Sequence, residues 1–144
     1  MQPPPRLDDQ LCFSVYTASQ AIVRAYQPFL DRLGVTYTQF LVMMALWESD
    51  DLTLGQLGAR LHLDSGTLTP LSRRMEAAGL IVRVRDPVDE RRRRVQLTEK
   101  GRELGVLAGE EHAELVCRFT LPGEVSAPDL RDSLRMLAEL LRSA

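Results

Sequence analysis

Two cysteines, Cys12 and Cys117, are the residues of this 144-residue chain best suited to redox chemistry. The three tyrosines of the chain, Tyr16, Tyr26 and Tyr37, all follow soon after Cys12. A phenol O–H can donate a hydrogen bond to a thiolate, which is the form of cysteine that attacks oxidants. The spacing is compatible with a reactive thiol at Cys12, but taken by itself it favours ordinary packing of these aromatic rings and an incidental cysteine.

Distance along a helix decides which tyrosine can reach Cys12. Tyr16 lies four residues further along and therefore shares the helical face of Cys12. Tyr26 returns to nearly the same face, but about 21 Å along the axis at 1.5 Å per residue. Within one straight helix Tyr26 therefore cannot contact Cys12, but it can lie beside the Cys12 of a second chain if the two first helices pack antiparallel.

The arginines form a second set of candidate residues, because they are unevenly distributed. The whole chain has a net charge of −2 and a sequence pI of about 5.7, which on average argues against nucleic-acid binding. Between Arg60 and Arg102, however, ten arginines and one lysine face six acidic residues, a local charge of +5 that leaves −7 for the rest. A basic middle predicts a polyanionic partner, and the alternative is a solvated charged face.

The elements that must position these residues begin with two helices. Apolar residues recur at helical spacing from residue 8 to about residue 31, with Asp8 or Asp9 as the expected N-cap and Gly34 after the end. Thr36 or Thr38 is expected to open a second helix that runs to Trp47.

The basic middle has the pattern of a winged helix-turn-helix. Thr53 is expected to cap a short helix over residues 54–61, and a turn leads into a second helix over residues 66–78 that ends before Gly79. Alternating residues predict strands over 80–85 and 93–98, joined by a turn over 86–92. The fold class is therefore mainly α with a small β-hairpin wing.

Two further helices are expected over residues 98–119 and from Ser126 onward, the latter with a leucine stripe at Leu130, Leu134, Leu137 and Leu141. A partner subunit would bury such a stripe. We expect one domain over residues 1–144. Residues 8–34 and 99–144 would serve dimerisation and sensing, and residues 35–98 would bind DNA.

Four segments resemble the MarR family of dimeric winged-helix repressors, and within it the organic hydroperoxide resistance regulator (OhrR) branch of the two-cysteine type. Asp89-Glu90-Arg91 with Val95-Gln96-Leu97-Thr98 matches the family's D-x-R-x-x-x-V-x-L-T wing signature. The segment from Leu63 to Leu71 looks like the branch's entry to the recognition helix, and Gln10-Leu11-Cys12-Phe13 looks like its sensing cysteine.

The resemblance implies a cysteine switch. Cys12 would be oxidised by an organic hydroperoxide to a sulfenic acid, and Tyr26 and Tyr37 would hydrogen-bond its sulfur, with Tyr16 as a further candidate. Cys117 would then form an intersubunit disulfide with the oxidised Cys12, and the alternative for Cys117 is a buried small apolar residue.

The resemblance also implies recognition of a palindromic operator in double-stranded DNA by a homodimer. The second helix would enter the major groove, and the wing would enter the minor groove. Arg91 would pair with Asp89 to shape the wing, which leaves Arg92 as the residue expected to insert. The expected DNA-contacting residues are Ser65, Thr67, Thr69, Ser72, Arg73, Arg74, Arg85, Arg91, Arg92 and Arg93.

Other functions are less well supported by the sequence. His112, with Glu111, Glu114 and Cys117 nearby on one helix, is expected to be a surface histidine, and neither a metal nor a cofactor is predicted. Without an export signal or a membrane span, a cytoplasmic protein that is not an enzyme is expected. The alternatives are a MarR-type repressor released by a non-covalent ligand and a thiol peroxidase that turns over.

Overall fold

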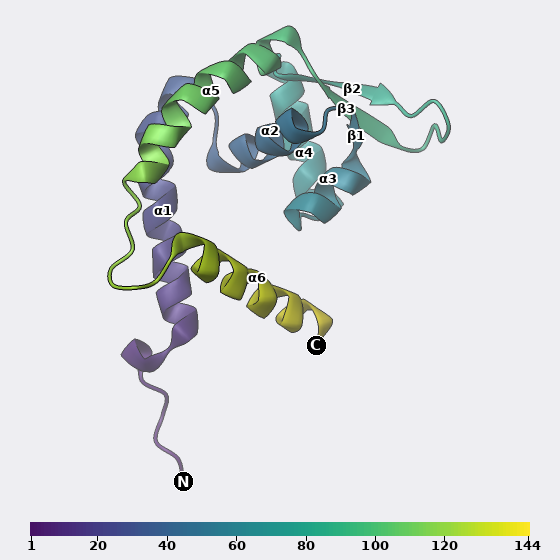
Figure 1. The fold of residues 1–144 in the computed structure, drawn as a ribbon. Helices are drawn as coiled ribbons and strands as arrows, with labels where there is room; N and C mark the ends of the chain where they lie inside the picture. The colour runs from purple at the N-terminus through teal and green to yellow at the C-terminus, as the bar shows by residue number, and fades with distance from the viewer. The chain divides into compact units, whose positions relative to one another are not determined.

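The computed structural model describes residues 1–144 and divides into two units, Met1–His112 and Ala113–Ala144. The assignment of a single domain stays a prediction. The elements follow the expected order, with helices in the majority and one small sheet (Figure 1). They are η1 (Leu7–Asp9), α1 (Leu11–Leu33), α2 (Tyr37–Glu48), β1 (Leu52–Thr53), α3 (Leu54–Leu61), α4 (Ser65–Ala77), β2 (Ile81–Arg85), β3 (Arg93–Leu97), α5 (Glu99–Cys117) and α6 (Ala127–Ser143).

Side-chain caps define the starts of the helices that surround the turn. Thr36 and Thr53 each accept a hydrogen bond from the backbone N–H three residues on, and Gln39 and Gln56 return the bond, which completes two capping boxes. Asp64 caps α4 through the N–H of Thr67 at 2.8 Å. Because Asp64 is the cap, α4 begins at Ser65, one residue earlier than expected.

The start of α1 differs from the prediction. Asp8 and Asp9 lie in the short 3₁₀ helix η1, and Gln10 precedes α1 without a side-chain cap, so the predicted N-cap was wrong. The predicted end is confirmed, because Gly34 follows Leu33 with φ of 69°, a left-handed conformation that glycine adopts at little cost.

A three-stranded antiparallel sheet, in the order β1-β3-β2, replaces the expected two-stranded hairpin. Leu52 pairs with Val95, and Ile81 pairs with Leu97. The strand β1 is only two residues long, so it carries no alternation that sequence reasoning could detect. The hairpin of β2 and β3 projects away from helices α2 to α4 (Figure 1).

The core of the first unit lies between α1, α2, α4 and the sheet. Its fully buried side chains include Phe29, Phe40, Met43, Leu57, Leu68, Met75 and Val95. Helix α5 is held against α2 by the Trp47 indole N–H, which donates to the Gly101 carbonyl oxygen at 2.9 Å. The first turns of α5 are thus anchored to α2.

Gly101 is required for this close approach. A Cβ atom at Gly101 would collide with the Leu80 carbonyl oxygen and would lie 3.3 Å from Met43. Because a backbone carbonyl cannot give way cheaply, Gly101→Ala is expected to lower the free energy of unfolding by about 1–3 kcal/mol. Urea unfolding at one protein concentration measures this change.

Gly109 provides the matched control on the same helix. Nothing lies within 4 Å of a Cβ atom placed there. Gly109→Ala should therefore gain helix propensity, about 1 kcal/mol, instead of losing stability. Equal losses of stability in both variants would contradict the packing argument.

The second unit consists of the end of α5, a loop and α6. Ser126 caps α6 by accepting from the Asp129 N–H at 3.1 Å, as expected from the sequence. Leu130, Leu134 and Leu141 of the α6 leucine stripe are exposed in the single chain, and Leu137 is half-buried. No helix of the chain is both long enough and apolar enough to traverse a bilayer.

Candidate nucleic-acid interface and thiol site

The exposed face of α4 carries four of the ten residues expected to contact DNA, and a fifth is half-buried there. Ser65, Thr67, Arg73 and Arg74 are exposed, and Thr69 is half-buried. Hydroxyl and guanidinium groups on one helical face can reach both base edges and phosphates in a major groove. This arrangement is suited to a recognition helix.

The prediction that Ser72 contacts DNA is wrong. Its side chain is only 1% exposed, and its hydroxyl donates to the Thr69 carbonyl oxygen at 2.9 Å. It lies between Leu71 and Met75 on the buried face of α4, so it belongs to the core and is not available to DNA.

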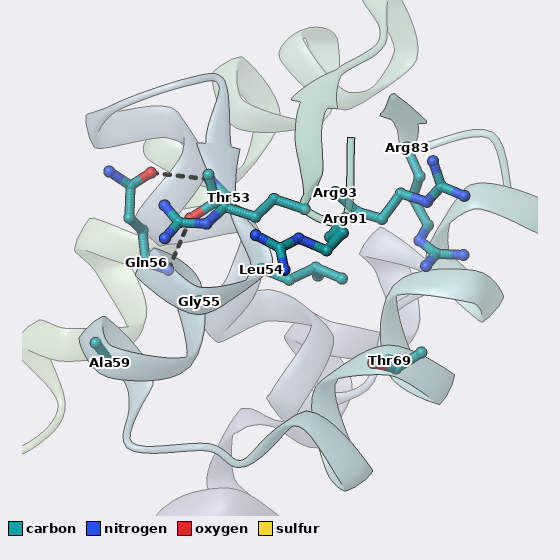
Figure 2. Close-up of a pocket in the computed structure, with 10 residues that line it drawn as sticks. Thr53, Leu54, Gly55, Gln56, Ala59, Thr69, Arg83, Arg91 and Arg93 are labelled. Atoms are coloured by element: carbon teal, nitrogen blue, oxygen red, sulfur yellow. Dashed lines mark hydrogen bonds between the residues drawn. The ribbon is translucent and has the colours of Figure 1, made fainter. Parts of the chain in front are cut away.

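An arginine groove separates the hairpin from the start of α3. Its volume is about 690 Å³, and Figure 2 shows arginine side chains of the hairpin beside the first turn of α3. None of the lining residues is acidic. They are Thr53, Leu54, Gly55, Gln56, Ala59, Thr69, Arg83, Arg91, Arg92 and Arg93. Four guanidinium groups without a carboxylate among the lining make this groove attractive to a polyanion.

Arg83 is the member of this groove that sequence reasoning missed. It lies on β2 two residues before Arg85, so the two-residue period of a strand points both side chains to the same face. Its Nε atom is buried without a hydrogen-bond partner. Because a buried donor of this kind is costly to leave unpaired, Arg83 is well placed to gain a partner from a bound anion.

Asp89 contacts both arginines at the tip of the hairpin. Its carboxylate lies 3.3 Å from Arg91 Nε and 3.6 Å from Arg92 Nε, and it also accepts from the Arg91 backbone N–H at 3.1 Å. The side chain of Arg91 is 91% exposed and that of Arg92 is 69% exposed. Since Asp89 contacts both, insertion of Arg92 in particular stays a prediction.

A second acidic residue, Asp86, holds the base of the hairpin. One carboxylate oxygen accepts from the N–H groups of Val88 at 2.8 Å and Asp89 at 3.0 Å, and the other lies 3.0 Å from Arg94 Nη1. Arg94 also contacts Asp51 at 2.8 Å, which ties the hairpin to the residues before β1. No local spacing in the sequence predicts this network, because Asp51 and Arg94 are distant in the chain.

The backbone N–H groups of Asp89 and Val88, with Arg94, hold the pKa of Asp86 below its usual 3.8. A carboxylate with a depressed folded-state pKa contributes stability above its unfolded pKa, and this contribution is lost as the pH falls through the folded pKa. We therefore expect the melting temperature of the protein to fall more steeply below about pH 4 than that of Asp86→Asn.

Thermal unfolding monitored by circular dichroism over this pH range measures the difference. Asp8→Asn, which changes an exposed carboxylate in η1, is the matched control. It should follow the wild-type curve. The assignment of Asp86 fails if its variant also follows that curve.

Both cysteines are free and exposed. Cys12 is the second residue of α1, and Cys117 is the last residue of α5. Tyr16, one turn further along α1, is also exposed, and its hydroxyl accepts from Gln20 Nε2 at 3.0 Å.

Tyr26 and Tyr37 lie together, as the predicted site requires. Their ring centroids are 5.4 Å apart in an edge-to-face arrangement, and Tyr26 is 8% exposed. Burial, and for Tyr26 also the charge of an ionised Tyr37, raises the pKa of both phenols above 10.0. Both hydroxyl groups therefore keep their hydrogens at neutral pH and can serve as donors.

His112 is a second correction. It was expected to be a surface histidine with its hydrogen bonds satisfied. Its Nε2 atom does lie 2.9 Å from a partner, the Tyr26 hydroxyl oxygen, but the residue is half-buried and not exposed. The ring also packs against Phe29 and Phe40, with centroid distances of 6.0 Å and 5.8 Å. No group of three potential metal-ligating side chains is present around it or elsewhere.

Comparison with known sequences identifies the relatives of this chain. Residues 35–92 match the MarR family. The organic hydroperoxide resistance transcriptional regulator of Bacillus subtilis (strain 168) is 48% identical over 96 residues, which cover 67% of this chain and 65% of that protein. The regulator TtmR of Methylorubrum extorquens (strain PA1) is 52% identical over 101 residues, which cover 70% of this chain and 52% of that protein. The chain thus spans about half to two thirds of the length of these relatives.

Solved structures extend the likeness over nearly the whole chain. The crystal structure of AbfR from Staphylococcus epidermidis is 32% identical, with a TM-score of 0.77, and the match covers 96% of this chain and 95% of that one. Other structures of AbfR are of the reduced protein bound to DNA, of the overoxidized protein bound to DNA and of a disulfide form. The sequence motifs, the winged-helix fold and these likenesses agree: the chain belongs to the MarR family.

Proposed function

We propose that this chain is a dimeric transcriptional repressor that binds a palindromic operator and releases it when an organic hydroperoxide oxidises Cys12. The observation that carries the DNA-binding part is the arginine groove beside the exposed face of α4, because it combines four guanidinium groups with no acidic lining residue. The relative named for organic hydroperoxide resistance, and the disulfide form of AbfR, support the redox part.

In the DNA complex, α4 lies in the major groove and the tip of the hairpin lies over the adjacent minor groove. Arg73 and Arg74 contact phosphates and bases from α4, and Arg92 follows the narrow minor groove. Arg83 binds a phosphate from the arginine groove. Arg85, exposed on the same strand, extends this positive surface. We call α4 and the hairpin of one subunit a DNA-reading head. A two-fold symmetric dimer presents two DNA-reading heads, so its operator is palindromic.

The dimer buries apolar side chains that a single chain leaves exposed. Leu11, Phe13, Val15 and Ile22 of α1 are exposed, as is most of the leucine stripe of α6. Antiparallel packing of two α1 helices brings Tyr26 and Tyr37 of one subunit to Cys12 of the other. Their hydroxyl groups then donate to the sulfur and stabilise its thiolate form.

The first chemical step is a two-electron oxidation of Cys12. The thiolate sulfur attacks one peroxide oxygen, the S–O bond forms and the O–O bond breaks. The alkoxide that leaves takes a proton and becomes an alcohol, while Cys12 becomes a sulfenic acid. In the second step the Cys117 thiolate attacks this sulfur, hydroxide leaves as water, and an intersubunit disulfide forms.

The disulfide changes the distance between the two DNA-reading heads. Its formation requires the two Cα atoms to come within about 7 Å, and helices that move to satisfy this requirement also move the elements anchored to them. In this chain α5 carries Cys117 at one end and is bonded to Trp47 near the other.

A gel-shift experiment on the protein's own promoter fragment tests the proposal. Reduced protein should retard the fragment, and cumene hydroperoxide should abolish the retardation until a thiol reductant restores it. Non-reducing gels should show a covalent dimer that is absent in Cys117→Ser. If the peroxide leaves both the retardation and the gel mobility unchanged, the redox part is wrong.

A second candidate function is release by a non-covalent ligand. It is favoured by a groove of about 520 Å³ between the end of α1 and the start of α2, lined partly by the apolar residues Val23, Leu30 and Val35 and by Tyr37. A ligand in this groove would act equally on wild type and on Cys12→Ser. Release that survives this substitution would therefore favour the second candidate.

A further inference from the structure

His112 forms the most specific polar contact that the known motifs leave unexplained. Its Nε2 atom lies 2.9 Å from the Tyr26 hydroxyl, although the two residues are 86 positions apart. The imidazole ring packs against three aromatic rings, those of Tyr26, Phe29 and Phe40, at centroid distances of 5.8, 6.0 and 5.8 Å. The orientation of the ring is therefore determined by packing on α1 and α2.

Neighbouring charges hold the backbone of this part of α5 in place. Glu111, the preceding residue, forms an ion pair with Arg32 of α1 at 2.6 Å. This pair and the aromatic contacts both join α5 to α1. The only other titratable side chain in the aromatic cluster is Tyr37, which contacts Tyr26 edge to face. His112 thus faces Tyr26 in a fixed geometry.

The direction of this hydrogen bond decides what the Tyr26 hydroxyl can do next. A phenol has one hydrogen and can also accept, whereas a neutral imidazole nitrogen is either a donor or an acceptor. If Tyr26 donates to His112, its only hydrogen is used. If His112 donates to Tyr26, the phenol acts as the acceptor in this bond and can donate its own hydrogen to a different group. A thiolate sulfur accepts but cannot donate, so it requires the second arrangement.

We propose that His112 is a positioning residue for the redox switch: its Nε2–H donates to the Tyr26 oxygen and directs the phenolic hydrogen to the Cys12 sulfur of the partner subunit. This inference rests on the proposed function, because it concerns the oxidation of Cys12. A hydrogen bond received by the phenol oxygen also polarises its O–H group, which strengthens the bond that the phenol donates.

The rate of Cys12 oxidation tests the proposal. His112→Phe keeps an aromatic ring in the cluster but removes the donor. We expect it to slow sulfenic acid formation by an organic hydroperoxide about fivefold, the equivalent of one net hydrogen bond of about 1 kcal/mol. His112→Gln, whose amide Nε2 lies at the same reach along the side chain, should recover most of the rate. Operator affinity of the reduced variants shows that they are folded.

A double-mutant cycle separates positioning from a general structural role. If His112 acts through the Tyr26 hydroxyl, then adding His112→Phe to Tyr26→Phe should change the rate no further. A similar slowing in both backgrounds would overturn the proposal, as would an unchanged rate in His112→Phe. A faster rate would also overturn it, because it would mean that the imidazole takes the phenolic hydrogen.

A direct measurement on the wild-type protein needs no variant to fold. Nitrogen NMR of protein labelled at histidine shows which ring nitrogen carries the hydrogen, and only His62 and His112 contribute signals. The neutral ring of His112 should carry its hydrogen on Nε2, and an unprotonated Nε2 would overturn the proposal. If Cys12 of the wild type forms no sulfenic acid at all, it is the proposed function that fails; if wild type reacts and only the His112 expectations fail, the proposed function stands.

Discussion

Cys12→Ser should bind the operator as tightly as the wild-type protein and should no longer release it when organic hydroperoxide is added. Serine keeps the size of the side chain, and Cys12 is exposed in the first turn of α1, so the fold should not change. A hydroxyl group is not oxidised by a peroxide, so the chemical signal is lost. Coupling between two sites typically changes affinity by about 5- to 150-fold, and this whole change should disappear.

Fluorescence anisotropy with a labelled operator measures the affinity before and after peroxide treatment. Cys117→Ser is the informative companion, because it should still form the sulfenic acid but not the covalent dimer. Release that persists in Cys12→Ser would contradict the assignment of Cys12 as the sensor. Release that persists in Cys117→Ser but is lost in Cys12→Ser would show that the sulfenic acid is sufficient for release without the disulfide.

Operator affinity should depend steeply on salt. Each phosphate that an arginine neutralises releases counterions, and a protein that contacts six to ten phosphates loses about 10³–10⁵-fold in affinity between 50 and 200 mM salt. The arginine groove and the exposed arginines of α4 provide enough cations on each of two subunits. Anisotropy titrations at several salt concentrations measure the slope, and a flat profile would contradict phosphate recognition by this surface.

Arg83 allows a single contribution to this slope to be isolated. Arg83→Ala should weaken binding to every operator sequence and lower the salt slope by about 1 for each phosphate that Arg83 neutralises in the wild-type complex. Arg6→Ala, which removes the same charge from the exposed segment before α1, is the matched control and should leave the slope unchanged. Equal slopes for the two variants would exclude Arg83 from phosphate binding.

The periodicity of α4 already contained the information needed to place Ser72. Leu68, Leu71, Ser72 and Met75 follow the spacing of a single buried helical face, and all four are buried. The assignment of Ser72 to the DNA surface relied on its hydroxyl group alone, against this periodicity. Arg83 was missed although its strand alternation with Arg85 was visible. In both cases the period of the helix or strand held the signal that the assignment left out.

The helices, most of their caps and the hairpin could be derived from the sequence, because these features depend on residues close together in the chain. The capping boxes at Thr36 and Thr53 each span four residues, and the end of α1 is set by Gly34. The uneven distribution of arginines likewise located the basic surface, since neighbouring residues on one hairpin must share a region of space.

Only the tertiary structure decided which distant groups pair. Asp51 with Arg94 and Tyr26 with His112 are contacts between elements far apart in the sequence, and residue spacing carries no information about such contacts. They depend on how helices and strands pack, and therefore on the burial of side chains such as Phe29 and Phe40 between them. A histidine expected at the surface consequently lies against the very tyrosine proposed to bind the reactive sulfur.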